Sequence, residues 1–294
     1  MNAIKKFPYT EVLGWSVSRY DKFANCKRQY FYDYYAKYDG EIPFEKLQFL
    51  KSLTSKALET GNIAHDIIRD MLFRFQKSAK PLNKDKFFKY CQNIAEKYCA
   101  SKIFVEHYYG NEMISSGEIY DRVKTMLENF IESGRFKWIL ENAVCESSKW
   151  IIEPDGFGET RINGLKAFCK VDFLFPVGDK IYIMDWKTGK PSLDKHSKQL
   201  TGYSAWANYH FNKKSCDIFP IIVYLSPCYS ETSVLIDDKK IADFALSVEK
   251  ETKEMYDYLA DAQKNVPKDK KEFPLTSKTF FCKYCNYREI CKKI

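Results

Sequence analysis

The chain has 294 residues, 45% of them apolar and 16% aromatic, which excludes a wholly disordered protein and allows a sizeable core. Its 47 Lys and Arg against 39 Asp and Glu give a formal charge of +8, which fits a nucleic-acid partner but also many soluble enzymes. No stretch resembles a signal peptide or reaches the ~18 apolar residues of a membrane helix, so we expect a cytoplasmic protein with no membrane partner.

The first half of the chain is predicted to be helical. A helix with an aromatic face is expected over residues 16–38, with Ser18 and Asp21 as a capping box. Gly61 comes just before the apolar positions of a second helix. The spacing of apolar residues predicts two further helices, over 83–107 and 115–141.

Short apolar runs separated by Gly, Pro and Asp begin near residue 143 and predict strands. We expect these strands over 144–152, 159–163, 165–175, 180–187, 219–227 and 231–236. A helix over 192–211 crosses between two of them, and a polar helix over 238–264 leads to a solvated linker over 264–274. This order predicts an α/β fold with a mixed central sheet flanked by helices, an N-terminal helical region and a cysteine-rich tail.

The stretch IYIMDWKTGK at 181–190 ends an apolar strand with two charges on one face, Asp185 and Lys187. A buried charge is costly unless it is paired or binds a metal. Asp172 lies within the preceding predicted strand, and a short turn joins the two strands. The two carboxylates can therefore converge on a divalent cation, with Lys187 beside a metal-bound water. The alternative is an Asp185–Lys187 ion pair at the strand end, with Asp172 capping a turn.

Two helices add further polar candidates. Gln199 and Tyr203 lie at i and i+4 and share a face that could contact a phosphate backbone, unless Tyr203 only packs in an amphipathic helix. His65 lies on the face of Ile68 and Leu72. It is either a histidine satisfied within the core or an imidazole ligand to the same cation.

In this order, these elements resemble the PD-(D/E)XK nuclease superfamily, and specifically its RecB-like branch. The resemblance rests on Gly61 and His65, Asp172, the Asp185–Gly189 strand end, and Gln199 and Tyr203. It implies a restriction-endonuclease-like fold that binds Mg²⁺ or Mn²⁺ through His65, Asp172, Asp185 and the backbone carbonyl of Trp186. It also implies that Asp172, Asp185 and Lys187 are catalytic and that Gln199 and Tyr203 bind the substrate.

Ten cysteines in a reducing compartment favour thiols or metal ligands over disulfides. Cys282, Cys285 and Cys291 form C-x₂-C-x₅-C, and three close thiolates need a fourth ligand, which Cys26 in FANCKRQYFY offers. The other six show no ligand spacing: Cys91, Cys99, Cys145, Cys169, Cys216 and Cys228.

One Cys ahead of the core and three after it resembles RecB-like nucleases with an iron–sulfur cluster, such as AddB and the CRISPR-associated enzymes. The aromatic-rich helix after Cys26 matches, although Lys27 stands where a proline is often found. The resemblance implies a structural [4Fe–4S] cluster on the four cysteines. Zn²⁺ on the same thiolates is the alternative.

The sequence therefore predicts a metal-dependent DNA nuclease, an exonuclease on single-stranded DNA or DNA ends. We expect a single domain over 1–294, with a helical region over 16–140, a catalytic core over 141–237 and a cluster-binding C-terminal part over 238–294. Because it lacks G-x-x-x-x-G-K-[ST], the chain is expected to work alone or with a helicase or other proteins in recombination, repair, phage or CRISPR-type DNA processing. The alternatives are a non-catalytic DNA- or partner-binding module and a zinc-stapled interaction protein.

Overall fold

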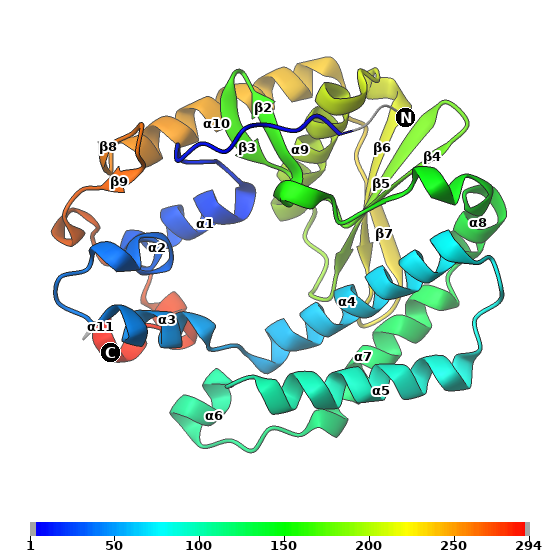
Figure 1. The fold of residues 1–294 in the computed structure, drawn as a ribbon, viewed down its shortest axis with the longest axis horizontal. Helices are drawn as coiled ribbons and strands as arrows, with labels where there is room; N and C mark the ends of the chain where they lie inside the picture. The colour runs from blue at the N-terminus through cyan, green and yellow to red at the C-terminus, as the bar shows by residue number, and fades with distance from the viewer. Residues whose placement is uncertain (1–3, 292–294) are drawn as a thin grey trace. The chain divides into compact units, whose positions relative to one another are not determined.

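The computed structural model describes residues 4–291, and these residues form two compact units. Within the described range, the first unit takes in residues 4–5, 54–160 and 169–244, and the second takes in 6–53, 161–168 and 245–291. Figure 1 traces the chain through both units. The single domain expected over 1–294 stays a prediction.

The first unit is built on a five-stranded sheet of order β1-β4-β5-β6-β7 (Figure 1). The strands are β1 (Ile151–Ile152), β4 (Phe173–Val177), β5 (Lys180–Lys187), β6 (Ile218–Tyr224) and β7 (Ser230–Ser233). Helix α9 (Leu193–Phe211) connects β5 to β6, so these two strands run parallel, whereas the other neighbours are antiparallel. The mixed sheet flanked by helices confirms the predicted α/β fold.

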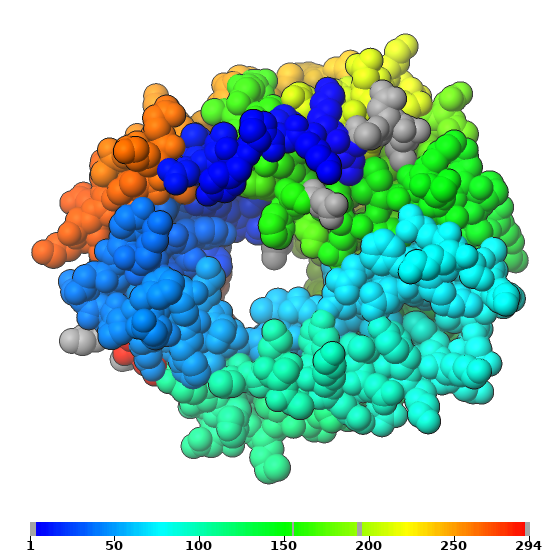
Figure 2. Space-filling model, viewed as in Figure 1, coloured from blue at the N-terminus to red at the C-terminus, as the bar shows by residue number. Residues whose placement is uncertain are grey.

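Four helices of the first unit pack around a shared apolar core, and the first two of them form most of the cyan surface in Figure 2. They are α4 (Lys56–Lys77), α5 (Lys84–Ser101), α7 (Ser116–Ile131) and α8 (Gly134–Asn142); the short α6 (Val105–Gly110) follows α5. Met184 and Trp186 of β5 belong to this core, with the Trp186 ring 4.8 Å from that of Phe130. Side chains alternate along a strand, so Asp185 points to the opposite face of the sheet, where α9 lies.

Four sequence expectations that fall wholly or partly in this unit are wrong. Most of the strand predicted over 144–152 is the 3₁₀ helix η2 (Val144–Lys149). Two helical predictions are interrupted: 83–107 between α5 and α6, and 115–141 at Ser133, whose hydroxyl caps α8. The strand predicted over 165–175 is broken into β3 (Leu165–Phe168) and β4.

The break between β3 and β4 has a visible cause. The amide of Cys169 donates to the Gly158 carbonyl at 3.0 Å, and the amide of Glu153 donates to the Asp172 carbonyl at 3.0 Å. Gly158 has a φ of +67°, and a Cβ there would lie 2.5 Å from the Cys169 carbonyl oxygen, so only glycine permits this approach. The turn containing η3 (Asp155–Gly158), together with β2 (Glu159–Ile162), therefore occupies the backbone groups that a continuous strand would use.

The second unit holds an aromatic core. Its helices are α1 (Val17–Asn25), α2 (Lys27–Tyr35), η1 (Ala36–Tyr38), α3 (Phe44–Ser52), η5 (Lys270–Glu272), η6 (Thr279–Tyr284) and α11 (Arg288–Cys291). A hairpin of β8 (Leu259–Asp261) and β9 (Val266–Pro267) follows α10 (Asp238–Tyr256), whose first residues belong to the first unit; η4 (Ser215–Asp217) lies in the first unit. The rings of Phe23 and Tyr258 pack at 5.2 Å, and those of Phe31 and Phe273 at 5.0 Å.

The helix predicted over 16–38 is two helices. Ser16, not Ser18, caps the first, because its hydroxyl accepts from the Arg19 amide at 3.1 Å. The helical path breaks at Cys26, which is extended at φ −157° and whose thiol accepts from the amide of Gln29. The predicted long helix 238–264 ends at Tyr256.

The solvated linker predicted over 264–274 is also wrong. Lys270 is only 9% exposed, and its ammonium lies 2.9 Å from Asp39 Oδ1 and 2.9 Å from Glu41 Oε2. Phe273 is fully buried. Among the described residues, no helix is both long and apolar enough to cross a membrane.

Candidate active site

Strand register brings the two predicted carboxylates together. In the antiparallel β4–β5 pair, Phe173 lies opposite Met184, which places Asp172 and Asp185 on the next rung. Asp172 lies just before β4, and its Oδ2 accepts a 2.9 Å hydrogen bond from the Trp186 amide. The expected convergence of Asp172 and Asp185 is therefore present, and the Trp186 carbonyl as a metal ligand stays a prediction.

Helix α4 brings His65 to the same place. Its Nδ1 lies 3.4 Å from Asp172 Oδ2, and the side chain is 28% exposed. Gly61, one turn earlier, makes this possible, because a Cβ at that position would lie 3.1 Å from the Thr188 hydroxyl oxygen at the end of β5. The Gly-then-His pattern on this helix thus corresponds to a close approach between α4 and the strand end.

The two oxygens of the Asp185 carboxylate have different surroundings. Oδ1 accepts from the Gln199 amide at 3.0 Å and from the Tyr203 hydroxyl, while Oδ2 forms an ion pair with the Lys187 ammonium. Oδ2 is buried and receives no hydrogen bond of good geometry from any described residue, so the ion pair is its one polar contact there. Both Asp185 and Tyr203 are 2% exposed.

Gln199 and Tyr203 were expected on the substrate side. In this structure they contact Asp185, with Tyr203 buried, so they orient the carboxylate; a substrate-binding role stays a prediction. The Asp185–Lys187 ion pair that the sequence offered as an alternative is present, but it lies within a buried cluster and not at an isolated strand end.

Burial and mutual repulsion separate the pKa values of the carboxyls. Burial raises the pKa of Asp185 to about 6, with the Asp172 charge adding to the effect and Lys187 opposing it. Burial also raises the pKa of Asp172. The charge and the hydrogen bond of the nearby His65 imidazole lower it by more, so the pKa of Asp172 lies below its usual range. Burial lowers the pKa of His65, and the nearby Asp172 charge more than reverses this, leaving that pKa above its usual range.

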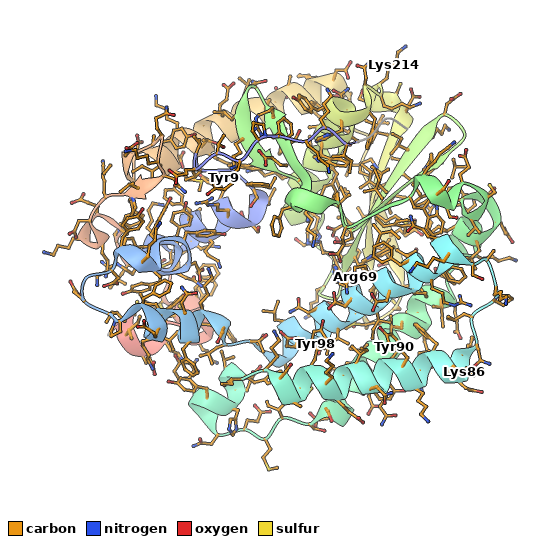
Figure 3. All side chains as sticks on the ribbon, viewed as in Figure 1. Tyr9, Arg69, Lys86, Tyr90, Tyr98 and Lys214 are labelled. Atoms are coloured by element: carbon orange, nitrogen blue, oxygen red, sulfur yellow. The ribbon has the colours of Figure 1, made fainter. Side chains whose placement is uncertain are left out.

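Asp172, His65 and Lys187 line a cleft of about 730 Å³. Its basic lining residues are Lys102, Lys170, Lys187 and Lys190, with His65 and His196 also on its wall; its acidic ones are Glu59, Asp66, Glu153 and Asp172. Figure 3 labels Arg69 of α4 and Tyr98 of α5, which belong to the helix pair beside this cleft.

Sequence reasoning assigned no role to two side chains beside the site. Glu153 has a left-handed backbone, φ +43°, and its carboxylate lies 2.7 Å from the Lys170 ammonium. His196, one helical turn before Gln199, lies 2.7 Å from the Tyr224 hydroxyl. The sequence separation within each pair follows no helix or strand period, so the sequence alone could not predict either contact. Glu153 and Tyr224 come near the site only through the arrangement of the strands.

The side chains of His65, Asp172 and Asp185 are of the types that bind a divalent cation, but their donor atoms do not surround one point in this structure. Among residues 4–291, no three His, Cys, Asp or Glu side chains are placed as a ready-made metal site. The Lys187 ammonium lies against Asp185 Oδ2, the carboxylate oxygen that has no directed hydrogen bond. A cation that displaced this ammonium would gain oxygen and imidazole ligands of the kind that Mg²⁺ and Mn²⁺ accept.

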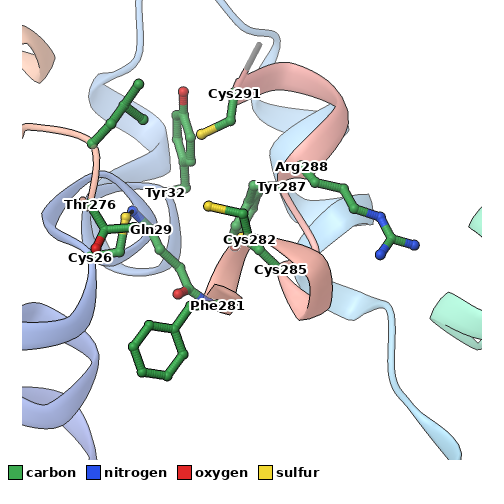
Figure 4. Close-up of a pocket in the computed structure, with 11 residues that line it drawn as sticks. Cys26, Gln29, Tyr32, Thr276, Phe281, Cys282, Cys285, Tyr287, Arg288 and Cys291 are labelled. Carbon is green, nitrogen blue, oxygen red and sulfur yellow. Dashed lines mark hydrogen bonds between the residues drawn. The ribbon is translucent and has the colours of Figure 1, made fainter. Parts of the chain in front are cut away.

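The second unit brings together the four predicted cysteines. Cys26, Cys282, Cys285 and Cys291 line one small pocket, which Gln29, Tyr32, Leu275, Phe281 and Tyr287 help to enclose (Figure 4). Burial raises the pKa of the Cys285 thiol to about 12, and the neighbouring cysteines add to this. A thiol of that kind becomes a thiolate only with a bound metal, so the donor set fits a cluster or zinc. None of the four forms a disulfide in this structure.

Comparison with known proteins places the chain in a family. A model of the PD-(D/E)XK nuclease superfamily matches residues 14–292. The chain belongs to the PD-(D/E)XK nuclease superfamily. Membership of this superfamily indicates a nuclease, which hydrolyses phosphodiester bonds, acts on DNA and uses a divalent metal such as Mg²⁺.

Other comparisons add little to the PD-(D/E)XK assignment. No curated protein matches the chain. A solved structure titled "Crystal structure of SSO0001" is similar at 17% identity, with a TM-score of 0.30, over 64% of this chain and 78% of that one. That likeness is too low to carry an argument.

Proposed function

We propose that this PD-(D/E)XK protein is a RecB-like, metal-dependent DNA exonuclease acting on single-stranded DNA or DNA ends. The supporting observation is that the buried Asp185 carboxylate lies beside Asp172, which lines one cleft together with His65 and Lys187. Two carboxylate charges close together and largely shielded from water repel each other strongly unless a cation neutralises them. A role beside a helicase or in recombination, phage or CRISPR-type processing belongs to the same proposal.

The metal ligands in this proposal are His65, Asp172, Asp185 and the Trp186 carbonyl. When bound, Mg²⁺ or Mn²⁺ supplies Lewis acidity to the phosphodiester and lowers the pKa of a bound water. Gln199 and Tyr203 hold Asp185 Oδ1, so the carboxylate plane is fixed before substrate arrives. A cation on Asp185 Oδ2 would free the Lys187 ammonium from its ion pair, and the positive charge of Lys187 would then offset the charge that develops on the phosphate.

A nuclease assay tests the catalytic assignment. End-labelled single-stranded DNA is incubated with Mg²⁺ or Mn²⁺ and wild-type protein, Asp185→Asn or Lys187→Ala, with the exposed pair Asp121→Asn and Lys137→Ala as controls. We expect each site variant to lose at least about 100-fold in rate and the controls to keep wild-type rates. Cleavage at wild-type rate by both site variants would exclude the assignment. DNA binding without any cleavage by the wild type would favour the non-catalytic binding module.

For the second unit, we propose a structural [4Fe–4S] cluster on Cys26, Cys282, Cys285 and Cys291. It would connect the start of α2 to η6 and α11 and close a very long loop, which stabilises a fold by limiting its unfolded states. Anaerobically purified protein should be brown and contain iron, and Cys26→Ser should lose both while retaining a hydroxyl cap for α2. A colourless protein with stoichiometric zinc would replace the cluster by the zinc alternative.

A further inference from the structure

Beside the proposed metal ligands, α4 carries a polar pair that the proposed chemistry does not use. Glu59 is 3% exposed, and its Oε1 accepts from the Thr54 hydroxyl at 2.8 Å and from the Asn62 amide at 3.1 Å. Oε2 is buried and receives no hydrogen bond from any described residue. The Thr54 and Asn62 donors therefore offset a buried charge that would otherwise be costly, and this makes the Glu59–Asn62 contact strong.

This contact fixes how the exposed Asn62 side chain is turned. A carboxylate only accepts hydrogen bonds, so the amide nitrogen of Asn62 must face Glu59 and the amide oxygen must face away from it. One amide hydrogen is thereby committed. The amide oxygen and the second hydrogen remain as an adjacent acceptor and donor on a side chain that lines the cleft.

Asn62 also lies next to the reacting centre. It follows Gly61, whose Cα is close enough to β5 that a Cβ would lie 3.1 Å from the Thr188 hydroxyl, and Thr188 follows Lys187. It precedes His65 by three residues, so the two side chains share a face of the helix. A nucleotide whose phosphate lies at Lys187 would therefore place its sugar and base within reach of this part of α4.

We propose that Asn62 binds the edge of a nucleobase next to the cleaved bond, with a preference for adenine, and that Glu59 is the positioning residue that sets the amide. An acceptor beside a donor on one amide matches the N6 donor and N7 acceptor of the major-groove edge of adenine, and no other base has a donor beside an acceptor on that edge. The inference rests on the proposed nuclease function and adds base preference to it.

Two other ligands fit this wall less well. A second cation would need several free carboxylate oxygens, but both oxygens of Asp66 are engaged, Oδ1 by Arg69 at 2.5 Å and Oδ2 by the Tyr98 hydroxyl. A phosphate would meet the negative charges of Glu59 and Asp66, whereas Lys187 and Lys190 offer it positive charge elsewhere in the cleft. A neutral, hydrogen-bonding base is the part of a nucleic acid that suits an asparagine between two carboxylates.

Cleavage of defined strands tests the preference. End-labelled oligo(dT) strands with one internal dA, dC or dG are digested with Mn²⁺, and the rate at each bond is read from the product ladder. We expect one bond at a fixed offset from dA to be cut at least about fivefold faster than the same bond beside dC or dT. Asn62→Ala should abolish this ratio, and Asn142→Ala, an exposed asparagine on α8 outside the cleft, should keep it. No base preference in the wild type, or an unchanged ratio in Asn62→Ala, would overturn the inference.

Glu59→Gln separates positioning from general damage. A glutamine amide can face Asn62 with either its nitrogen or its oxygen, so Asn62 is no longer held in one orientation. We expect the dA ratio to fall towards one, by a larger factor than any change in the rate on oligo(dT). A fall in both rates together would point to a structural role and count against positioning.

Binding without metal keeps the inference independent of catalysis. In EDTA, competition of oligo(dA) and oligo(dT) for a fluorescent single strand gives a ratio of affinities by anisotropy. Wild-type protein should favour oligo(dA) and Asn62→Ala should not, even if no metal supports cleavage and the nuclease proposal fails. Equal ratios for the two proteins would overturn base recognition by Asn62, whatever the cleavage assay shows.

Discussion

At the scale of single residues, the most unusual feature is the buried Asp185 carboxylate. It lies one rung from Asp172 with Lys187, Gln199 and Tyr203 around it, and its pKa is raised to about 6. The ionised Asp185 carboxylate destabilises the folded protein, yet the proposed site requires it. Stability and function are therefore in direct conflict at this residue.

Asp185→Asn should show this conflict as a gain in stability. The folded pKa of about 6 lies above that of an unfolded aspartate, so the folded protein binds more protons across that window and its stability falls as pH rises through it. Replacing the carboxylate with an amide should raise the free energy of unfolding of metal-free protein at neutral pH by about 1–2 kcal/mol. Urea unfolding in EDTA measures this, with Asp121→Asn as the control.

The same variant should no longer respond to metal. Mn²⁺ binds the folded state and should raise the melting temperature of the wild type but not that of Asp185→Asn. A variant less stable than the wild type in EDTA at neutral pH, or one that Mn²⁺ stabilises fully, would contradict this account.

His65 also makes stability fall as the pH rises, but the cause is its attraction to Asp172 and not burial or repulsion. Its folded pKa lies above the usual value, so its pairing with Asp172 contributes stability that is complete below the unfolded pKa and is lost as pH rises through the folded one. Metal binding needs the neutral imidazole, so Mn²⁺ affinity should increase as the pH rises above the usual histidine pKa of about 6.5. Calorimetric titration should show this rise in the wild type and in His107→Ala, and a weaker, flatter dependence in His65→Ala. Identical pH profiles for wild type and His65→Ala would remove His65 from the ligand set.

At the scale of elements, the approach of α4 to the end of β5 controls the site. A Gly→Ala change inside a helix normally stabilises by up to about 1 kcal/mol. At Gly61 the new methyl would meet the Thr188 hydroxyl, whereas at Gly134, at the start of α8, it would meet open space. We expect Gly61→Ala to lose about tenfold in nuclease rate through displacement of the strand end, with little net change in stability, and Gly134→Ala to keep full activity. A fully active Gly61→Ala variant would show that the contact has no catalytic consequence.

The elements also show where sequence reasoning succeeds. The predicted bounds of β5 are the observed ones, because Gly178 and Gly189 lie on either side of its apolar run and limit the strand. The predicted bounds of α9 differ from the observed ones by one residue. The convergence of Asp172 and Asp185 follows from the short turn between β4 and β5. The breaks at Cys26 and before Asp172 could not be predicted, because they depend on a thiol cap and on a turn whose partners lie several residues away.

At the scale of the whole molecule, the two candidate sites belong to different units. The nuclease candidates fall in the first unit, and all four cluster cysteines fall in the second. The predicted division at residues 140 and 237 reflects changes in local pattern, whereas the two units are each assembled from separate stretches of chain. No local pattern reveals that residues 6–53 and 245–291 form one unit, because their aromatic contacts join residues more than half the chain apart.

Hydrogen exchange should reveal the two sites separately. Mn²⁺ should slow exchange in β5 and the first turns of α9, where its proposed ligands and their supports lie. Loss of the cluster should speed exchange in α2, η6 and α11, although the tail keeps other attachments, such as the Tyr287 hydroxyl on Asp33 at 2.6 Å and the Asn286 amide on the Leu53 carbonyl at 2.8 Å. Uniform protection of the whole chain by Mn²⁺, or no change in α2 after cluster loss, would contradict this assignment.

The distribution of residues between the units has a consequence for biosynthesis. Every described residue of the first unit has left the ribosome once position 244 has emerged, whereas the second unit needs Cys291 to complete its cysteine set. Translation proceeds at about 5–20 residues per second, so the nascent chain has a few seconds in which the carboxylate pair can form while Cys26 still waits for its partners. During that interval a chaperone or a cofactor-delivery protein would encounter Cys26 alone.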